Sequence, residues 1–215
     1  MGVARYTIKE IYYTLQGEGA RTGRPAVLCR FAGCNLWSGR EADRADADCD
    51  FCDTDFVGTD GPGGGTFADP ESVASAIGAA WPRDPSPGVP YVVFTGGEPL
   101  LQLDVELIEA CHRAGFEVAV ETNGTCEAPP GIDWLTVSPK PGPPLRQRSG
   151  DELKLAFPQA KVTPESVAGL RFACFYLQPI DGPEREENTR RALDYCLRHP
   201  QWRLSLQTHK LLGIP

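Results

Sequence analysis

The strongest constraint on the fold is a series of short apolar runs that recur along the whole chain. Several runs, such as YVVF at 91–94, lack alternating polar residues and are therefore typical of strands covered on both faces. Together the runs predict a largely parallel sheet in an α/β fold. The predicted strands are residues 5–13, 26–33, 91–97, 116–124, 133–140, 152–157, 172–180 and 202–209.

Helical patterns separate some of these strands. Asp69 followed by Pro70 predicts a helix start, because an aspartate cap and a first-turn proline are both favoured there. The segment 103–115 carries apolar residues on one face and ends at Gly115, which suits a helix C-terminus. The segment 184–199 has acidic residues early and arginines late, as the helix dipole favours.

The chain is too short for a closed eight-fold barrel. Such barrels typically need about 250 residues. This chain has 215, and several predicted strands follow one another with no room for a helix. We therefore predict a single domain, residues 1–215, built as an abbreviated, partial (β/α) barrel. Two glycine- and proline-rich segments, 59–70 and 82–90, are predicted to be surface loops.

The charge of the chain favours a small-molecule partner. With a net charge of −8, the chain gains nothing from the phosphate attraction that drives general nucleic-acid binding, so we expect no nucleic-acid partner. No apolar run is long enough to span a bilayer, and the first residues lack the apolar stretch of a signal peptide. We expect a cytoplasmic enzyme or binding protein with no membrane partner.

Three of the eight cysteines lie close together, with Cys34 fourteen residues before the C-x-x-C pair of Cys49 and Cys52. A structural zinc site needs four ligands, and no histidine precedes His112. A thioredoxin-like pair would leave Cys34 without a role. Soft thiolates bind zinc and iron–sulfur clusters alike, so spacing alone leaves both open. On a cubane cluster, which four cysteines normally hold, three cysteines would leave one iron with an open position.

Polar residues gather where four predicted strands end, at 95–99, 121–124, 138–140 and 178–181. Because the carboxyl ends of parallel strands meet at one edge, we expect these segments to face one cavity. Taken singly, GGEP, SPK and QPID are each more often plain turns at the end of a strand.

These features occur in an order that resembles the 7-carboxy-7-deazaguanine synthase family of radical S-adenosylmethionine (SAM) enzymes. The superfamily usually has the spacing C-x3-C-x2-C, whereas the first gap here is fourteen residues. We interpret residues 34–56 as an enlarged cluster-binding loop, with 38–48 as an inserted excursion that costs little closure entropy. The motifs are LQGEG (15–19), CRFAGCNLW (29–37), CDFCDTDF (49–56), TGGEP (95–99), ETNGT (121–125), SPK (138–140), LQPID (177–181) and HK (209–210).

The resemblance implies a partial barrel of the radical SAM type with one 4Fe-4S cluster on Cys34, Cys49 and Cys52 and with SAM at the open iron. It implies conversion of 6-carboxy-5,6,7,8-tetrahydropterin to 7-carboxy-7-deazaguanine with loss of ammonia, in queuosine and 7-deazapurine biosynthesis. SAM would supply the radical chemistry, so no side chain is assigned a catalytic role. The resemblance also implies Mg2+ at Thr54, an electron donor such as flavodoxin or ferredoxin, and a homodimer.

The SAM contacts implied by the resemblance lie at the strand ends and in the cluster-binding loop. Gly96 and Gly97 would let the backbone approach the methionyl group closely. Glu98 would accept a hydrogen bond from its ammonium group, and Phe51 would lie against the adenine. The implied residues are Phe51, Cys52, Asp53, Gly97, Glu98, Ser138, Pro139, Lys140, Gln178, Pro179, Ile180 and Asp181.

The substrate contacts implied by the resemblance include both ends of the chain. Arg30 could bind the substrate carboxylate with two hydrogen bonds, although an arginine beside a buried strand is more often a structural ion-pair partner. The C-terminal tail is expected to fold over the pocket, whereas a frayed end is the common alternative. The implied residues are Leu15, Gln16, Gly17, Glu18, Arg30, Thr95, His209 and Pro215, while Glu121 and Asn123 are candidates without an assigned role.

Two alternatives remain open at this point. A glycyl-radical activase would share the cluster but would leave the LQGEG segment and the HK tail without a role. A zinc or iron–sulfur binding module without enzymatic activity would need only the cysteines.

Overall fold

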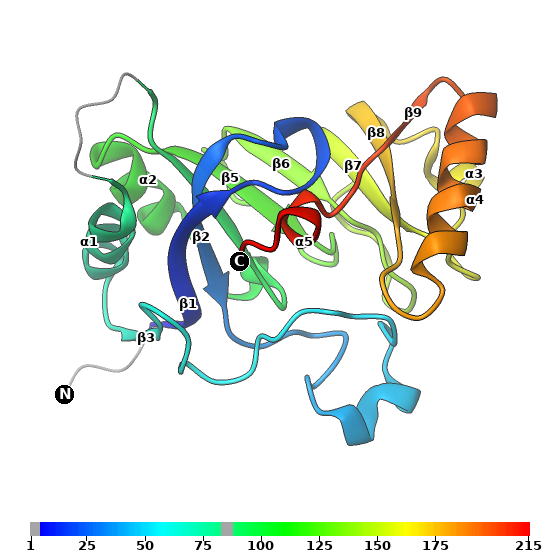
Figure 1. The fold of residues 1–215 in the computed structure, drawn as a ribbon. Helices are drawn as coiled ribbons and strands as arrows, with labels where there is room; N and C mark the ends of the chain where they lie inside the picture. The colour runs from blue at the N-terminus through cyan, green and yellow to red at the C-terminus, as the bar shows by residue number, and fades with distance from the viewer. Residues whose placement is uncertain (1–4, 83–87) are drawn as a thin grey trace.

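A computed structural model describes residues 5–82 and 88–215 of the chain. Residues 1–4 and 83–87, the latter within the predicted loop 82–90, lie outside it. In the described chain, one sheet has the strand order β3-β1-β2-β4-β5-β6-β7-β8-β9 (Figure 1). The strands are β1 (Tyr6–Leu15), β2 (Pro25–Phe31), β3 (Gly65–Phe67), β4 (Tyr91–Gly96), β5 (Glu117–Thr122), β6 (Trp134–Val137), β7 (Ser149–Phe157), β8 (Arg171–Pro179) and β9 (Trp202–Leu204).

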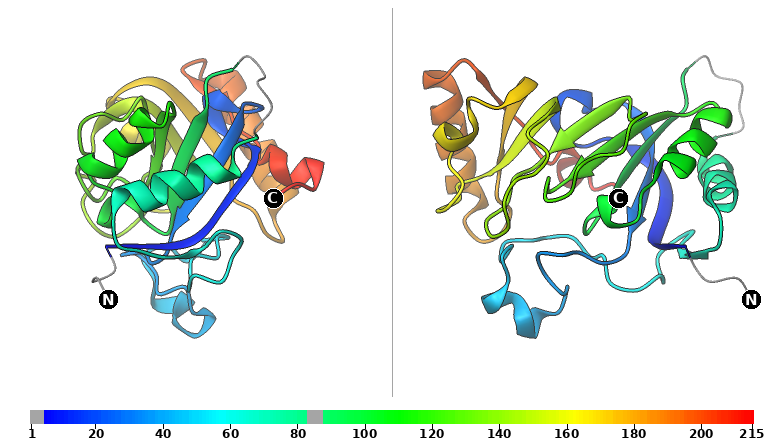
Figure 2. Two further views of the ribbon diagram at one scale, coloured as in Figure 1. Left: turned by 90° about the vertical axis from the view of Figure 1, so that its left-hand side faces the viewer. Right: turned by 180° about the vertical axis from the view of Figure 1, so that it is seen from behind.

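Helices flank the two ends of this sheet. Figure 2 shows α1 and α2 packed at the end near β1 to β5, and α3 and α4 at the end near β8 and β9. No helix in the described part of the chain is long and apolar enough to cross a bilayer. The α-helices are α1 (Pro70–Ala80), α2 (Val105–Arg113), α3 (Pro164–Val167), α4 (Arg185–Arg198) and α5 (Thr208–Leu212), and the 3-10 helices are η1 (Gly19–Arg21), η2 (Glu41–Asp46) and η3 (Pro99–Leu101).

The sheet is mostly parallel and stays open. Neighbouring strands from β2 to β9 run parallel, and β1 pairs antiparallel with β2 and β3. In the described residues, the edge strands β3 and β9 do not pair with each other. The connections from β5 to β6 and from β6 to β7 contain no helix. The predicted abbreviated, partial barrel is therefore confirmed.

The predicted helix ends follow from their capping residues. Asp69 accepts a hydrogen bond from the backbone N–H of Ser72 at 2.7 Å, which satisfies one of the free donors in the first turn of α1. Asp104 caps α2 in the same way, through the N–H of Leu107 at 3.0 Å. Gly115 follows α2 with a φ of +85°, a conformation that glycine adopts without strain.

The outer face of the sheet is apolar, whereas the inner face combines a small apolar cluster around Tyr91 and Val93 with charged side chains of β7. Phe94 of β4 belongs to a core cluster shared with α1 and α2. Leu155 of β7 and Leu177 of β8 belong to a second cluster, shared with α3 and α4. In β7, leucines alternate with Glu152 and Lys154, and all are buried, so the two charged side chains point into the partial barrel.

Two predictions about secondary structure are wrong. The predicted strand 202–209 ends at Leu204, because the chain then leaves the sheet and α5 begins at Thr208. There the backbone N–H of Thr208 donates to the Gly17 carbonyl at 2.9 Å, across the open side of the sheet. The predicted loop 59–70 contains the edge strand β3, which pairs with β1.

Glycines allow the segment before β3 to lie against β1. A Cβ atom at Gly64 would lie 2.2 Å from the Lys9 carbonyl oxygen and 2.6 Å from that of Thr59. A Cβ atom at Gly61 would lie 2.8 Å from the same Lys9 oxygen. Side chains at these positions would push backbone atoms apart, so the glycine run is needed for close packing as well as for turning.

We expect Gly64→Ala to lower the free energy of unfolding by about 1–3 kcal/mol, because the added methyl group has no space beside two carbonyl groups. Gly78→Ala is the matched control, since a Cβ atom at Gly78 in α1 meets nothing within 4 Å and should stabilise the helix by about 0.5–1 kcal/mol. Urea unfolding of the metal-free protein, followed by circular dichroism, measures both changes. Equal stability of the two variants would contradict this packing argument.

Candidate functional site

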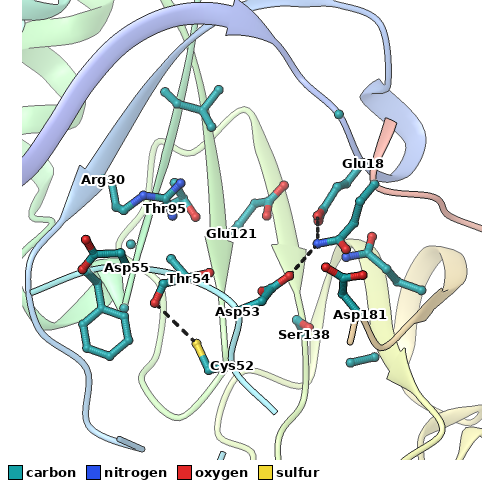
Figure 3. Close-up of a pocket in the computed structure, with 18 of the residues that line it drawn as sticks. Glu18, Arg30, Cys52, Asp53, Thr54, Asp55, Thr95, Glu121, Ser138 and Asp181 are labelled. Carbon is teal, nitrogen blue, oxygen red and sulfur yellow. Dashed lines mark hydrogen bonds between the residues drawn. The ribbon is translucent and has the colours of Figure 1, made fainter. Parts of the chain in front are cut away.

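A cavity of about 390 Å³ lies inside the open sheet, at the carboxyl ends of the parallel strands. Its walls come from the strand ends, the cluster-binding loop, the β1–β2 connection and the C-terminal tail, and Figure 3 shows part of this lining. Of the predicted cluster, magnesium, SAM and substrate residues, all but Glu98 and Pro139 line it. The structure thus brings together segments that are far apart in sequence, while their individual roles remain predictions.

The cluster-binding loop, residues 34–56, is closed at its base by backbone hydrogen bonds. The N–H of Asp48 donates to the carbonyl of Leu36 at 3.1 Å, and the N–H of Gly33 donates to the carbonyl of Phe56 at 3.1 Å. These contacts bring the two arms of the loop together, so the fourteen residues between Cys34 and Cys49 do not separate these cysteines in space. All three cysteines border the cavity.

The three thiols fit an iron–sulfur cluster. The Cys49 thiol donates a hydrogen bond that lowers the pKa of Cys52 to about 6, so Cys52 is readily available as a thiolate, the form that binds metals. Among the described residues, no three histidine, cysteine or acidic side chains converge closely enough to hold a single metal ion. A cubane spreads its cysteine ligands over separate irons. Three soft donors around one cavity therefore suit a cluster better than zinc.

Positions 96 and 97 require glycine for a packing reason that is independent of any ligand. A Cβ atom at Gly97 would lie 2.1 Å from the Gly33 carbonyl oxygen and 2.7 Å from the Cys34 Cβ atom. A Cβ atom at Gly96 would lie 2.4 Å from the carbonyl oxygen of Phe31. Gly97 therefore lets the end of β4 touch the start of the cluster-binding loop, and Gly96 lets it touch the end of β2, whatever the two glycines also contribute to a ligand.

Glu98 lies behind the cavity wall. Its buried carboxylate accepts hydrogen bonds from the Thr122 hydroxyl at 2.7 Å and from the backbone N–H groups of Leu100 and Asn123 at 2.9 and 2.7 Å. Burial raises the pKa of Glu98, against the opposing effect of these hydrogen bonds. In this conformation Glu98 joins the ends of β4 and β5, and its predicted contact with an ammonium group remains untested.

The predicted SAM residues include a cation close to the cysteines. The Lys140 ammonium group donates to the Ser138 hydroxyl at 2.5 Å and lies 6.0 Å from the centre of the Phe51 ring. Loss of solvation lowers the pKa of Lys140, while the nearby Cys49 and Cys52 thiolates oppose this change. Pro139, between the two polar residues, is buried and does not reach the cavity.

A buried ion network joins three predicted residues, Gln16, Glu18 and Glu121, to Lys154, which the sequence analysis did not include, and forms another wall of the cavity. Lys154 of β7 pairs with Glu18 at 2.5 Å and with Glu121 at 3.0 Å. The amide of Gln16 donates to the other oxygen of Glu121 at 2.9 Å. Burial alone would lower the pKa of Lys154, but the facing carboxylates raise it. The sequence carries a usable signal, since Glu152 and Lys154 alternate with leucines in a predicted strand.

The LQGEG segment closes the open side of the partial barrel. The backbone N–H of Gly19 donates to the Ser205 hydroxyl beyond β9, and that of Ala20 donates to the Glu152 carboxylate, both at 2.9 Å. Gly19 has a φ of +66°, and a Cβ atom there would overlap the Glu152 carboxylate. A Cβ atom at Gly17 would lie 2.3 Å from Nδ1 of His209. The glycines thus admit contacts from β7 and from the C-terminal tail.

Arg30 is both an ion-pair partner and a cavity residue. Its Nε donates to the Glu10 carboxylate at 2.7 Å, and its side chain lines the cavity beside Thr95. Thr54, the predicted magnesium ligand, is also at the cavity wall. The neighbouring Asp55 is held by the ammonium group of Lys9 at 2.8 Å.

Comparison with known proteins identifies the family. A model of the radical SAM superfamily matches residues 43–138. The chain is 63% identical to a 7-carboxy-7-deazaguanine synthase of Bordetella pertussis, over 98% of this chain and 99% of the relative. It is 64% identical to a protein of the same name from Bradyrhizobium diazoefficiens, over 97% and 99%. It is also similar to the crystal structure of QueE from Escherichia coli, with 29% identity, a TM-score of 0.67 and coverage of 95% and 94%.

Radical SAM proteins hold a 4Fe-4S cluster and SAM, which agrees with the soft donor set at one side of the cavity. Identity above 60% over nearly the full length of both relatives shows a shared family. The chain therefore belongs to the 7-carboxy-7-deazaguanine synthases, a family of radical SAM enzymes.

Proposed function

We propose that this enzyme converts 6-carboxy-5,6,7,8-tetrahydropterin to 7-carboxy-7-deazaguanine with loss of ammonia. The observation that carries the proposal is one cavity with two chemically distinct regions. One region contains three cysteines and the Lys140 ammonium group. The other contains the Glu18–Lys154–Glu121 network. The first suits a cluster and SAM, and the second suits a flat heterocycle with several N–H groups.

The cluster region offers ligands for the cofactors. Cys34, Cys49 and Cys52 would hold one 4Fe-4S cluster, and the iron without a cysteine would bind SAM through its amino and carboxylate groups. When bound, the two cofactors supply one-electron chemistry that removes a hydrogen atom from a substrate carbon. Ser138 and Lys140 would bind polar groups of SAM, and residues 178–181 would border its adenine.

The opposite region offers partners for a pterin. Burial raises the pKa of Glu18, but the adjacent Lys154, together with Gln178 and His209, outweighs this effect and keeps the net pKa below its ordinary value. Glu18 is therefore ionised at neutral pH and accepts hydrogen bonds, as the N–H groups of a pterin require. Arg30 would bind the substrate carboxylate. Thr54 would be one oxygen ligand of Mg2+, whose octahedron substrate and water would complete.

The C-terminal tail would cover the bound substrate. Lys210 of α5 pairs with Asp53 at 2.5 Å and with Asp181 at 2.6 Å, so it joins the cluster-binding loop to the end of β8. The Thr14 hydroxyl donates to the terminal residue Pro215 at 2.8 Å. The tail thereby holds His209 and Pro215 at the cavity, where they would contact the pterin and exclude water.

The remaining features of the proposal come from the family resemblance. We propose that residues 1–215 act as one domain, that the enzyme works in the cytoplasm as a homodimer, and that a flavodoxin or ferredoxin donates the electron.

Anaerobically reconstituted protein, given SAM, Mg2+, dithionite and the carboxylated tetrahydropterin, is expected to form 7-carboxy-7-deazaguanine, identified by ultraviolet absorbance and mass. Cys52→Ser should abolish product, because the cluster then lacks a ligand. Cys126→Ser, which lies away from the cavity lining, is the matched control and should remain active. Absence of deazaguanine from a SAM-responsive cluster protein would favour an activase. Colourless protein with stoichiometric zinc would favour a binding module.

We expect Lys154→Met to make pterin binding depend on pH. Without this cation, burial raises the pKa of Glu18 above its ordinary value, so Glu18 is protonated at lower pH and ionises only as pH rises. Relative to the native protein, KM of Lys154→Met for the pterin should therefore increase most near pH 6 and return toward the native value near pH 9. Lys154→Arg keeps the positive charge, so its KM should change less with pH. A pH-independent KM in both variants would contradict this role.

We expect Lys210→Met to loosen the tail, because two ion pairs to Asp53 and Asp181 are lost, each typically contributing about 0.2–1 kcal/mol when partly exposed. Amide hydrogen exchange of residues 205–215 at pH 7 should become faster. Lys161→Met, which removes an exposed lysine from the connection between β7 and α3, is the control. Unchanged exchange in the Lys210 variant would show that these pairs do not hold the tail.

A further inference from the structure

We infer that Arg44, inside the enlarged part of the cluster-binding loop, is a positioning residue for the iron–sulfur cluster and favours its reduced state. Arg44 lies in η2, within the fourteen residues that separate Cys34 from Cys49. The inference rests on the proposed function only in assuming that the three cysteines hold a cluster.

The Arg44 guanidinium binds the backbone of the C-x-x-C pair. Its Nη1 donates to the carbonyl oxygens of Asp50 and Cys52, both at 2.9 Å. A guanidinium NH2 group has two hydrogens, so one nitrogen can serve both acceptors. This bridge fixes the orientation of two peptide groups next to the thiolate ligands of Cys49 and Cys52.

The other side of Arg44 is held by the first arm of the loop. The guanidinium carbon lies 4.1 Å from the centre of the Trp37 ring, and Nε donates to both carboxylate oxygens of Glu41 at 2.8 Å. Trp37 is nearly buried and packs edge-on against Phe56 at 5.6 Å between ring centres. Because Trp37 follows Cys34 by three residues, Arg44 joins the arm that carries the first cysteine to the arm that carries the other two.

The same contacts place a positive charge beside the cluster site. Reduction adds one electron to a centre whose thiolate ligands are already negative, so a nearby cation favours the reduced state. Glu41 opposes this effect only weakly, because its side chain is 77% exposed and water screens its charge, whereas that of Arg44 is 28% exposed.

The enlarged part of the cluster-binding loop therefore supports the C-x-x-C segment. Here the insertion folds back and supplies its own cation and a double hydrogen-bond donor to the C-x-x-C segment. Hydrogen-bond partners that orient the ligands of a metal typically change its affinity by about 10–100-fold when removed.

Three variants test the inference on reconstituted protein. Arg44→Gln removes the charge and the bridge. Arg40→Gln removes the same charge from the same loop at an exposed residue whose side chain makes no hydrogen bond or ion pair within the described part of the chain. Arg44→Lys restores the charge without the planar fork. The measurements are the midpoint potential of the cluster by EPR-monitored titration and the rate of iron loss to a ferrous chelator.

We expect Arg44→Gln to have a lower midpoint potential than the native protein and Arg40→Gln, and to lose iron about 10–100-fold faster. Arg44→Lys should recover part of the potential. Equal potentials in Arg44→Gln and Arg40→Gln, or no recovery in Arg44→Lys, would overturn the inference. Circular dichroism of the metal-free proteins checks that each variant folds. Failure of the native protein to turn over the pterin, with a normal EPR signal, would count against the proposed function alone.

Discussion

The site depends on one buried lysine between two carboxylates. Lys154 of β7 pairs with Glu18 from the β1–β2 connection and with Glu121 of β5, so three distant segments meet at one ammonium group. A charge buried without a partner is strongly unfavourable, so each member of this network requires the others. The open sheet thereby gains a polar interior wall, and the LQGEG segment is fixed where the sheet lacks a closing strand.

The parts of the fold that local sequence determines could be predicted. Asp69, the predicted cap of α1, acts through a neighbour three residues away, and Gly115, the predicted end of α2, directly follows that helix region. The sequence also predicts that the strand-end motifs face one cavity, because parallel strands place their carboxyl ends together whatever the connections between them. Pairings across the chain could not be predicted. The partners of Lys154 lie 33 and 136 residues away, and nothing local indicates either.

Glycine motifs show that a sequence pattern can locate a feature correctly and still give only part of the reason why glycine is needed there. From the sequence alone, the glycines of TGGEP are explained by the close approach of a bound ligand. In the structure, a side chain at Gly97 has no room beside Gly33 and Cys34 even when no ligand is bound. The glycine-rich segment before β3 predicts a surface loop from its sequence, yet Gly64 is packed against the Lys9 carbonyl. In both cases the chain needs glycine for the approach of another backbone, which only the tertiary structure reveals.

The enlarged cluster-binding loop is consistent with elementary chain statistics. Lengthening a flexible gap from three to fourteen residues costs about 1.4 kcal/mol of closure entropy, by the logarithmic dependence on length. The hydrogen bond from Asp48 to Leu36 and the two from Arg44 can each return about 0.5–1.5 kcal/mol, enough to offset that cost. The match to the superfamily model begins at residue 43 and so omits Cys34. The spacing of the cysteines can vary in this way because contacts at the base of the loop, rather than its length, set how far apart the thiols lie.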